Sequence, residues 1–370
     1  MRHAAVVERE MAGLRWLIIS GPGDEVFRTL GIVAAEDIAA VLDCMPERAG
    51  LASYVRAGVG RARLAAVTDA TIRDHPNPFR ELRELSAGAG APFEELLLLN
   101  LRGDLGVEDG TGCTDLAWRA ARGYLAHNED GAPVLAQHLS VLTIRVDGQP
   151  AVTVHWYPGF VPANTVVATE AGLVWGVNHI QVRVPATAAG RHFVARDLQR
   201  ETTFAGACGY LSSNPSAGGF AYIIGDVATG DIAVIETAAA RHTQRTLTDD
   251  GALHWHTNHL RYLDPEIDTP PPASQPCDRA TDRLGSHSES ITRGAATDAL
   301  GSATEPVAPW LAEALSGRRS AGIHRNASGG DPLMTLTTTI TDLAAAAITV
   351  HSHHGTTRTL PLSTYLARTT

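Results

Sequence analysis

The residue of this sequence best placed to do chemistry is Cys113. It follows Gly112, and the pair lies between the polar run Gly106–Gly110 and a long region rich in strand-type alternation. The Cys113 thiol could attack the carbonyl carbon of Gly112, convert the peptide bond to a thioester and, after hydrolysis, leave Cys113 at the start of a new chain. Its freed α-amine has a reference pKa of about 7.7–8.0 and can then serve as the base for the thiol. The sequence therefore predicts autocleavage between Gly112 and Cys113 and a nucleophilic Cys113; burial as a small apolar side chain is the competing interpretation.

Two polar clusters downstream offer candidates for the rest of such a site. Asn128-Glu129-Asp130 supplies two carboxylates that could orient an amine or polarise the nucleophile. The competing interpretation is an ordinary turn formed by these three residues and Gly131. His256-Thr257-Asn258-His259 ends a predicted strand, and the amide group of its asparagine is a competent oxyanion donor.

Composition limits the classes of protein that this chain can represent. Its 370 residues, 44% of them hydrophobic, suffice for one large domain or two ordinary ones, and the net charge of −10 argues against nucleic-acid and anionic-membrane partners. All 30 basic residues are arginines, which excludes lysine Schiff bases and Ser-Lys catalysis. The 4 cysteines form no C-x-x-C pair, and residues 1–15 lack the apolar core of a secretory signal. We therefore expect a reduced, cytoplasmic protein.

The elements that must position these side chains change in type near Cys113. Before it, helical spacing predicts a mostly helical segment with one strand over 14–20 and helices from about residue 24, over 32–67 with breaks at Pro46 and Gly50, and over 92–100. After it, period-two alternation predicts strands over 139–146, 151–157, 173–184, 219–226, 232–237, 253–259, 333–342 and 346–351. A helix is predicted over 191–203, and connections over 264–276 and 294–305. This run of antiparallel strands favours an α+β fold over βαβ alternation.

Six short motifs occur in the order found in the isopenicillin N acyltransferase family of N-terminal nucleophile hydrolases, which this chain resembles over nearly its whole length. They are Gly21–Gly31, Asn100-Leu101-Arg102, Gly112-Cys113-Thr114, Asn128-Glu129-Asp130, Gly176-Val177-Asn178 and His256-Thr257-Asn258-His259. Three features depart from the family pattern. Asp115 stands where a threonine or serine is usual, Glu129 replaces a tryptophan, and the segment after Asn178 lacks the second glycine.

The resemblance implies a four-layer αββα sandwich of two antiparallel sheets, in which segments 1–112 and 113–370 form one globular unit and stay associated after cleavage. It also implies that Asp130 lies near the amine of Cys113 and that Asn258 lies in the oxyanion hole. We expect three residues to bind substrate: Asn128, Asn178 and His256. The implied activity is that of an autoproteolytic cysteine amidohydrolase or acyltransferase acting on the amide or thioester bond of a small acylated amine. No cofactor and no metal are expected, while acyl-coenzyme A as a co-substrate and an oligomeric state are left open.

Two other classes of function are also left open. An uncleaved homologue would bind a small molecule or a partner without turnover. A histidine metalloprotein would combine the pair His256 and His259 with the cluster His351, His353 and His354, although residues three apart on a strand point to opposite faces. The remaining cysteines are predicted to be structural: Cys44, Cys208 and Cys277.

Overall fold

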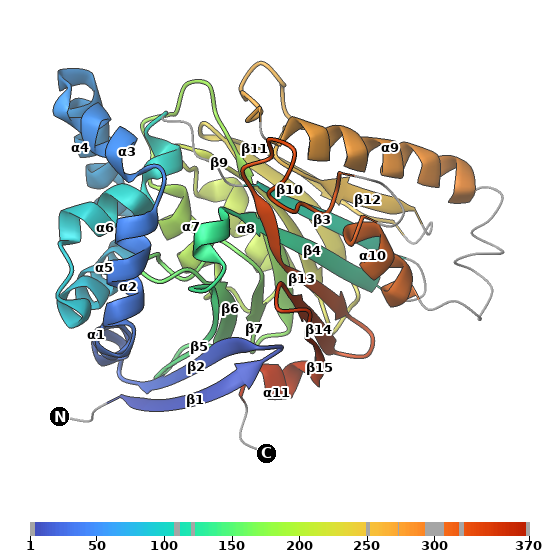
Figure 1. The fold of residues 1–370 in the computed structure, drawn as a ribbon, viewed down its shortest axis with the longest axis horizontal. Coiled ribbons are helices and arrows are strands. Elements are labelled where there is room, and N and C mark those ends of the chain that lie inside the picture. Colours follow the sequence, from blue (N-terminus) through green and yellow to red (C-terminus); the bar gives the residue numbers. More distant parts are fainter. Residues whose placement is uncertain are drawn as a thin grey trace.

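The computed structural model describes residues 4–106, 112–119, 123–248, 252–272, 274–292, 307–317 and 322–367. These residues form two β-sheets that pack face to face, with helices on the outer face of each sheet (Figure 1). The layers follow the order helix, sheet, sheet, helix, which confirms the predicted αββα sandwich. The predicted connection over 294–305 lies outside the described residues.

The larger sheet contains nine strands in the order β1-β2-β5-β6-β7-β8-β9-β10-β11. Their bounds are Ala5–Met11 (β1), Leu14–Gly21 (β2), Ser140–Val146 (β5), Val152–Trp156 (β6), Val167–Thr169 (β7), Leu173–Ile180 (β8), Gly219–Asp226 (β9), Ile232–Ala238 (β10) and Arg241–Thr246 (β11). Neighbouring strands are antiparallel except β2 and β5, which run parallel. The mostly helical N-terminal segment therefore also supplies two strands, β1 and β2, to a sheet whose other strands all follow Cys113.

The smaller sheet contains six strands in the order β12-β3-β4-β13-β14-β15, all antiparallel to their neighbours. Their bounds are Gly112–Arg119 (β3), Gly123–Gly131 (β4), Leu253–His256 (β12), Met334–Asp342 (β13), Ala347–Ser352 (β14) and Thr357–Pro361 (β15). The segment containing Cys113 is thus the start of an interior strand, β3, flanked on one side by β12 and on the other by β4.

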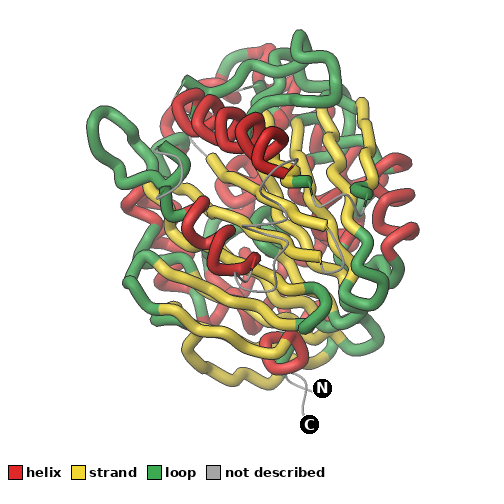
Figure 2. The backbone as a smooth tube through the Cα atoms, turned by 90° about the vertical axis from the view of Figure 1, so that its right-hand side faces the viewer, coloured by secondary structure: helices red, strands yellow, loops and turns green. Residues whose placement is uncertain are grey.

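The helices divide between the two outer faces. Those over the larger sheet are α1 (Gly23–Val33), α2 (Ala35–Cys44), α3 (Arg48–Arg56), α4 (Gly58–Asp74), α5 (Pro76–Ala89), α6 (Phe93–Asn100), α7 (Arg191–Leu198) and α8 (Phe204–Ser213). The helices α9 (Gln275–Thr292) and α10 (Val307–Leu315) lie across the outer face of the smaller sheet (Figure 2). Three short helices complete the described elements: η1 (Arg102–Asp104), η2 (Pro133–Leu135) and α11 (Leu362–Tyr365).

Successive side chains along β2 and β3 pack in different hydrophobic cores, one on each face of the sheet. In β2, Leu17 and Ile19 belong to the core beneath the N-terminal helices, whereas Trp16 belongs to the core between the sheets. In β3, Leu116 packs in the core with α9 and α10, whereas Ala117 faces the larger sheet. Because successive residues of a strand point to opposite faces, the odd-numbered residues at the start of β3 face the interior of the sandwich.

Most predicted strands occur close to their predicted bounds, and β9 spans the predicted residues. Two predicted strands are longer than the observed ones, since β8 ends at Ile180 and β12 ends at His256. The helix predicted over 191–203 ends at Leu198, and a second helix, α8, follows it because the Thr203 side chain accepts from Gly206 N and caps its N-terminus. No helix in the described part of the chain is both long and apolar enough to cross a bilayer.

Candidate active site

The hairpin of β3 and β4 determines which side chains surround the Gly112–Cys113 bond. Cys113 pairs with Glu129 in the strand register, and Gly112 pairs with Asp130. Cys113 and Glu129 therefore lie on the inner face of the sheet, toward the larger sheet. Asp130 lies on the outer face, which carries α9 and α10.

The inner face forms a continuous buried chain of polar groups that starts at the thiol. Cys113 Sγ lies 3.7 Å from Glu129 Oε2, and the same oxygen lies 3.1 Å from His127 Nε2. On the other side of the ring, His127 Nδ1 lies 2.9 Å from Asp115 Oδ1. The Tyr157 hydroxyl donates to Glu129 Oε1 at 2.8 Å. Cys113 is only 4% exposed, so these groups interact with little screening by water.

This environment keeps the thiol protonated. Burial and the Glu129 carboxylate raise the pKa of Cys113 to about 12, against His127, which lowers it. Burial would lower the pKa of His127, but Asp115 together with hydrogen bonds to both carboxylates and the thiol raises it well above its ordinary value. The arrangement is therefore a protonated thiol beside an imidazolium held between two carboxylates.

The Asn258 side chain holds the backbone at the Gly112–Cys113 peptide bond. Cys113 N donates to Asn258 Oδ1 at 3.1 Å, while Asn258 Nδ2 donates to the His179 carbonyl at 3.0 Å. A Cβ atom at Gly112 would lie 2.6 Å from Arg325 Nη1, 3.1 Å from Ser274 Oγ and 3.2 Å from Asn258 Oδ1. Position 112 thus has no room for a side chain, because polar groups approach its Cα directly.

Asp130 lies across the strand pair from Gly112. Its Oδ1 accepts from Thr335 Oγ1 at 2.7 Å, and its Oδ2 accepts no hydrogen bond from the described residues. Burial raises the pKa of Asp130 to about 7, against Arg325 and Thr335, which lower it. Arg325 itself pairs with Asp331. Asp130 is therefore a buried carboxyl with a vacant acceptor oxygen next to the predicted cleavage position.

The three predicted substrate-binding residues lie in different places. Asn128 is on the outer face, where it donates to the Leu315 carbonyl and accepts from Thr338 Oγ1. Asn178 is on the inner face and donates to Asp115 Oδ2 at 2.8 Å. His256 ends β12, the strand next to β3, and its Nε2 lies 2.8 Å from Glu236 Oε1. All three are buried, and their binding of substrate stays a prediction.

Four residues of this site did not emerge from the sequence. They are Asp115, His127, Tyr157 and Arg325. Asp115 and His127 had a detectable signal, because odd-numbered positions of two paired strands share one face, but using it required the β3–β4 register. Tyr157 follows the end of β6 and Arg325 lies in the segment before β13, so no local spacing connects them to Cys113.

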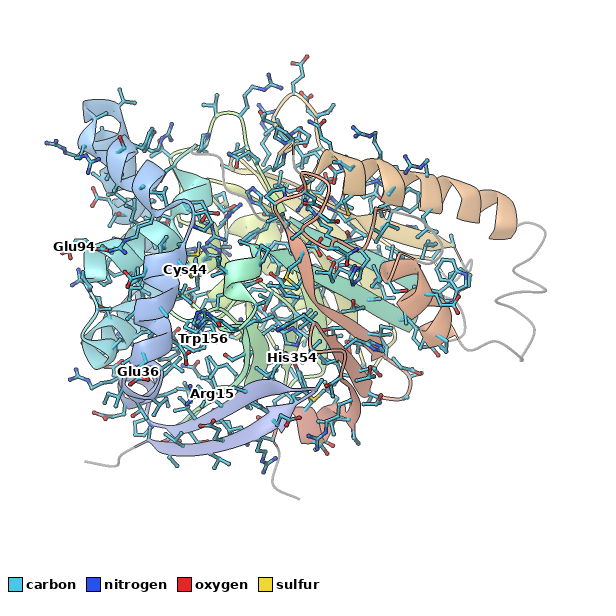
Figure 3. The ribbon with its side chains drawn as sticks, viewed as in Figure 1. Arg15, Glu36, Cys44, Glu94, Trp156 and His354 are labelled. Atoms are coloured by element: carbon cyan, nitrogen blue, oxygen red, sulfur yellow. The ribbon has the colours of Figure 1, made fainter. Side chains whose placement is uncertain are left out.

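The proposed histidine metal site does not assemble. His256 is on β12 and His351 on β14, and three strands, β3, β4 and β13, lie between them. His354 lies beside the turn of β1 and β2 at Gly13 (Figure 3). Within the described residues the one group of potential metal ligands is Cys113, His127 and Glu129, whose ligand atoms lie within 4.8 Å of one another.

The other three cysteines lie outside the buried chain of polar groups that links Cys113 to Glu129, His127 and Asp115. Cys44 ends α2 among the N-terminal helices (Figure 3), and Cys208 is buried in α8. Cys277 is buried on the outer face of β3, where its sulfur lies 3.1 Å from Thr114 Oγ1. These positions agree with packing roles.

A cavity of about 560 Å³ lies between α10 and strands β13 and β14. Its walls combine apolar residues of α10, such as Ala312, with threonines of β13 and with His351 and His353. Thr335, which donates to Asp130, is one of its lining residues. The cavity therefore adjoins the carboxyl group beside Gly112.

The fold and the site define a two-sheet sandwich with a buried cysteine at the start of an interior strand, and comparison with known proteins gives the family. The family model for acyl-coenzyme A:6-aminopenicillanic acid acyltransferase matches residues 118–352, more than half of the chain. The chain belongs to this acyltransferase family. The match begins after Cys113, so it does not include the predicted nucleophile.

Two solved structures share partial similarity. A mutant conjugated bile acid hydrolase from Clostridium perfringens aligns with a TM-score of 0.43 and 12% identity, covering 68% of this chain and 93% of that one. A penicillin V acylase from Agrobacterium tumefaciens aligns with a TM-score of 0.41 and 13% identity, covering 70% and 89%. A search of curated proteins finds no match.

Proposed function

We propose that this protein is a precursor that cleaves itself between Gly112 and Cys113 and so becomes an N-terminal cysteine amidohydrolase or acyltransferase. The observation that supports it most is the environment of the bond. The Cys113 nitrogen is held by Asn258, the thiol adjoins a carboxylate, and Arg325 approaches a Gly112 Cα that has no space for a side chain. Tight, polar packing around one peptide bond is what a positioned intramolecular reaction requires.

The first reaction is an acyl shift followed by hydrolysis. Cys113 Sγ attacks the Gly112 carbonyl carbon, the carbon–nitrogen bond breaks, and the nitrogen takes up the proton lost by the thiol. Water then hydrolyses the thioester, giving a Gly112 carboxylate, a free thiol and a free amine on Cys113. Asp130, one strand away with a vacant Oδ2 among the described residues, is placed to accept a hydrogen bond from that amine and orient it.

The second reaction uses the same thiol on substrate. Cys113 attacks the carbonyl carbon of a small acylated amine, the amine leaves with a proton, and the acyl group stays on sulfur until water or another amine accepts it. Asn258 Nδ2 serves as oxyanion donor once it turns from the His179 carbonyl.

Trapping the acyl-enzyme tests this proposal. Purified protein is mixed with acyl-amines and acyl-thioesters, including acyl-coenzyme A, quenched in acid and measured by intact mass. We expect an added acyl mass on the fragment that begins with Cys113, absent in Cys113→Ala, and products that report water or an amine as acceptor. An intact chain that binds these compounds without a covalent adduct would contradict the proposal and support a non-catalytic binding protein.

A further inference from the structure

The first reaction lacks the base that the second one has. Before cleavage the Cys113 nitrogen is part of a peptide bond, and its N–H donates to Asn258 Oδ1. An amide nitrogen has no basic lone pair, so the precursor needs another group to remove the thiol proton. With a thiol pKa of about 12, very little thiolate is present at neutral pH, and the thiolate is the reactive form.

We propose that Glu129 is the base that takes the Cys113 proton during self-cleavage, with His127 and Asp115 as positioning residues. This inference rests on the proposed autocleavage. Glu129 Oε2 is 3.7 Å from Cys113 Sγ, within the sulfur hydrogen-bond range, and both groups lie on the inner face of the β3–β4 hairpin.

The ring of His127 is occupied at both nitrogens. Nδ1 faces Asp115 and Nε2 faces Glu129, at 2.9 and 3.1 Å. An imidazole between two carboxylates is stabilised as the doubly protonated cation, in which both nitrogens donate and neither accepts. His127 therefore orients Glu129 instead of taking the thiol proton, and Asp115 fixes the ring from the other side.

Further contacts hold Glu129 in place. Tyr157 donates to Oε1 at 2.8 Å, which directs Oε2 toward the sulfur and His127. Asn178 donates to Asp115 at 2.8 Å, so the far end of the chain is also anchored. Other charged or titratable groups nearby are Asp130 and Arg325 on the outer face and the neutral His155, whose pKa burial lowers to about 3.

The proton balance of the step is closed. Glu129 takes the proton as the carbon–sulfur bond forms, and returns it to the Cys113 nitrogen as the carbon–nitrogen bond breaks. Glu129 ends the step ionised, and the new amine then carries the base function for substrate. No oxidant, metal or second molecule is needed before the hydrolytic water.

Cleavage kinetics of Glu129→Gln test this inference. Full-length protein is synthesised in a cell-free system with labelled methionine, synthesis is stopped, and fragments are followed over time; both fragments carry label, since Met11 and Met45 precede Gly112 and Met334 follows it. We expect cleavage of Glu129→Gln to be roughly 10²–10⁴-fold slower than wild type, the contribution of a positioned general base. Glu81→Gln, the same change at a buried carboxylate bound by Arg196 in the helical layer, should cleave at the wild-type rate.

Cleavage rates of Glu129→Gln over a range of pH distinguish the loss of a base from misfolding of the variant. Far below the thiol pKa, the thiolate fraction rises about tenfold per pH unit, so hydroxide should restore cleavage of Glu129→Gln between pH 7 and 10. A variant that stays uncleaved at pH 10, or one that cleaves like wild type at pH 7, overturns the role of Glu129. Absence of cleavage in wild type itself would instead overturn the proposed function.

Discussion

The close packing around Gly112 predicts that a side chain at this position slows self-cleavage. In Gly112→Ala the new methyl group would lie 2.6 Å from Arg325 Nη1 and 3.2 Å from Asn258 Oδ1. Both groups must move, and Asn258 then loses its hold on the Cys113 nitrogen. We expect self-cleavage to slow by roughly 10²-fold, as small misplacements of reacting groups do, measured as the rate of fragment appearance.

The control is Gly209→Ala in the exposed middle of α8, where no atom lies within 4 Å of the added methyl group. It should cleave normally and gain about 0.5–1 kcal/mol of stability, because alanine loses less backbone entropy in a helix. Equal cleavage rates for Gly112→Ala and wild type would contradict the packing argument.

Asp130 predicts a pH dependence of stability. Its folded-state pKa of about 7 exceeds the unfolded value of 3.8, so between these pH values the folded state keeps a proton that the unfolded state releases. Stability from this group is therefore present at low pH and lost as pH rises to 7. The test compares Cys113→Ala with Cys113→Ala/Asp130→Asn, because both keep one uncleaved chain. From pH 4 to pH 8 the unfolding free energy of the Asp130→Asn variant should rise relative to the protein with Asp130, by up to about 4 kcal/mol at 1.36 kcal/mol per pKa unit. Urea unfolding at both pH values measures the difference, and a pH-independent difference would count against the raised pKa.

The sequence identified part of the site and missed part of it. Cys113 and Asn258 were predicted, and the Asn258 side chain does contact the Cys113 nitrogen. Asn258 Oδ1 accepts this hydrogen bond, and the oxyanion-hole role of its Nδ2 stays a prediction. Asp115 and His127 were missed as site residues because a side chain's partner across a hairpin depends on register, and register depends on the turn and on which face is buried.

Asn100, at the end of α6, joins this helix to the loop between β6 and β7. Its side chain accepts from Val161 N at 2.7 Å and donates to the Gly159 carbonyl at 3.0 Å. Asn100→Ala leaves these two backbone groups buried without their partner. We expect a loss of roughly 2–4 kcal/mol in unfolding free energy, measured by urea denaturation in the Cys113→Ala background.

Asn77→Ala is the matched control, because Asn77 is exposed in the first turn of α5. Surface substitutions of this kind change stability by about 0.5 kcal/mol or less. An Asn100→Ala variant as stable as Asn77→Ala would contradict the role given to the buried amide.

Individual elements were predictable where their own pattern sufficed. Period-two alternation of apolar and polar side chains marked β5 and β13, although both faces of these strands are buried. The strand β1 was missed, since it is exposed along most of its length and offers no apolar alternation. The helix α8 was missed because the preceding helical pattern obscured the cap at Thr203, where a new helix begins.

The arrangement of the whole molecule predicts that the two cleavage products stay together. The strand β2, from the N-terminal product, pairs in parallel with β5 from the C-terminal product, and Trp16 Nε1 donates to Thr143 Oγ1 at 2.9 Å. The core beneath the N-terminal helices also contains residues from both products. Size-exclusion chromatography should give one peak with both fragments in buffer and two peaks in denaturant; separate elution in buffer would contradict a shared core.

This arrangement was only partly predictable. The antiparallel run after Cys113 indicated an α+β fold, and the resemblance supplied the two sheets and the four layers. The parallel contact of β2 with β5 joins segments more than a hundred residues apart and needs the intervening helices to pack first, so no local pattern encodes it.

Intact mass of the purified full-length protein tests the central claim most directly. Cys277→Ala is the matched control for Cys113→Ala, because Cys277 is equally buried but contacts Thr114 on the outer face of β3. Wild type and Cys277→Ala should each give two masses, for 1–112 and 113–370, while Cys113→Ala should give one full-length mass. A single full-length mass in all three proteins would contradict the account.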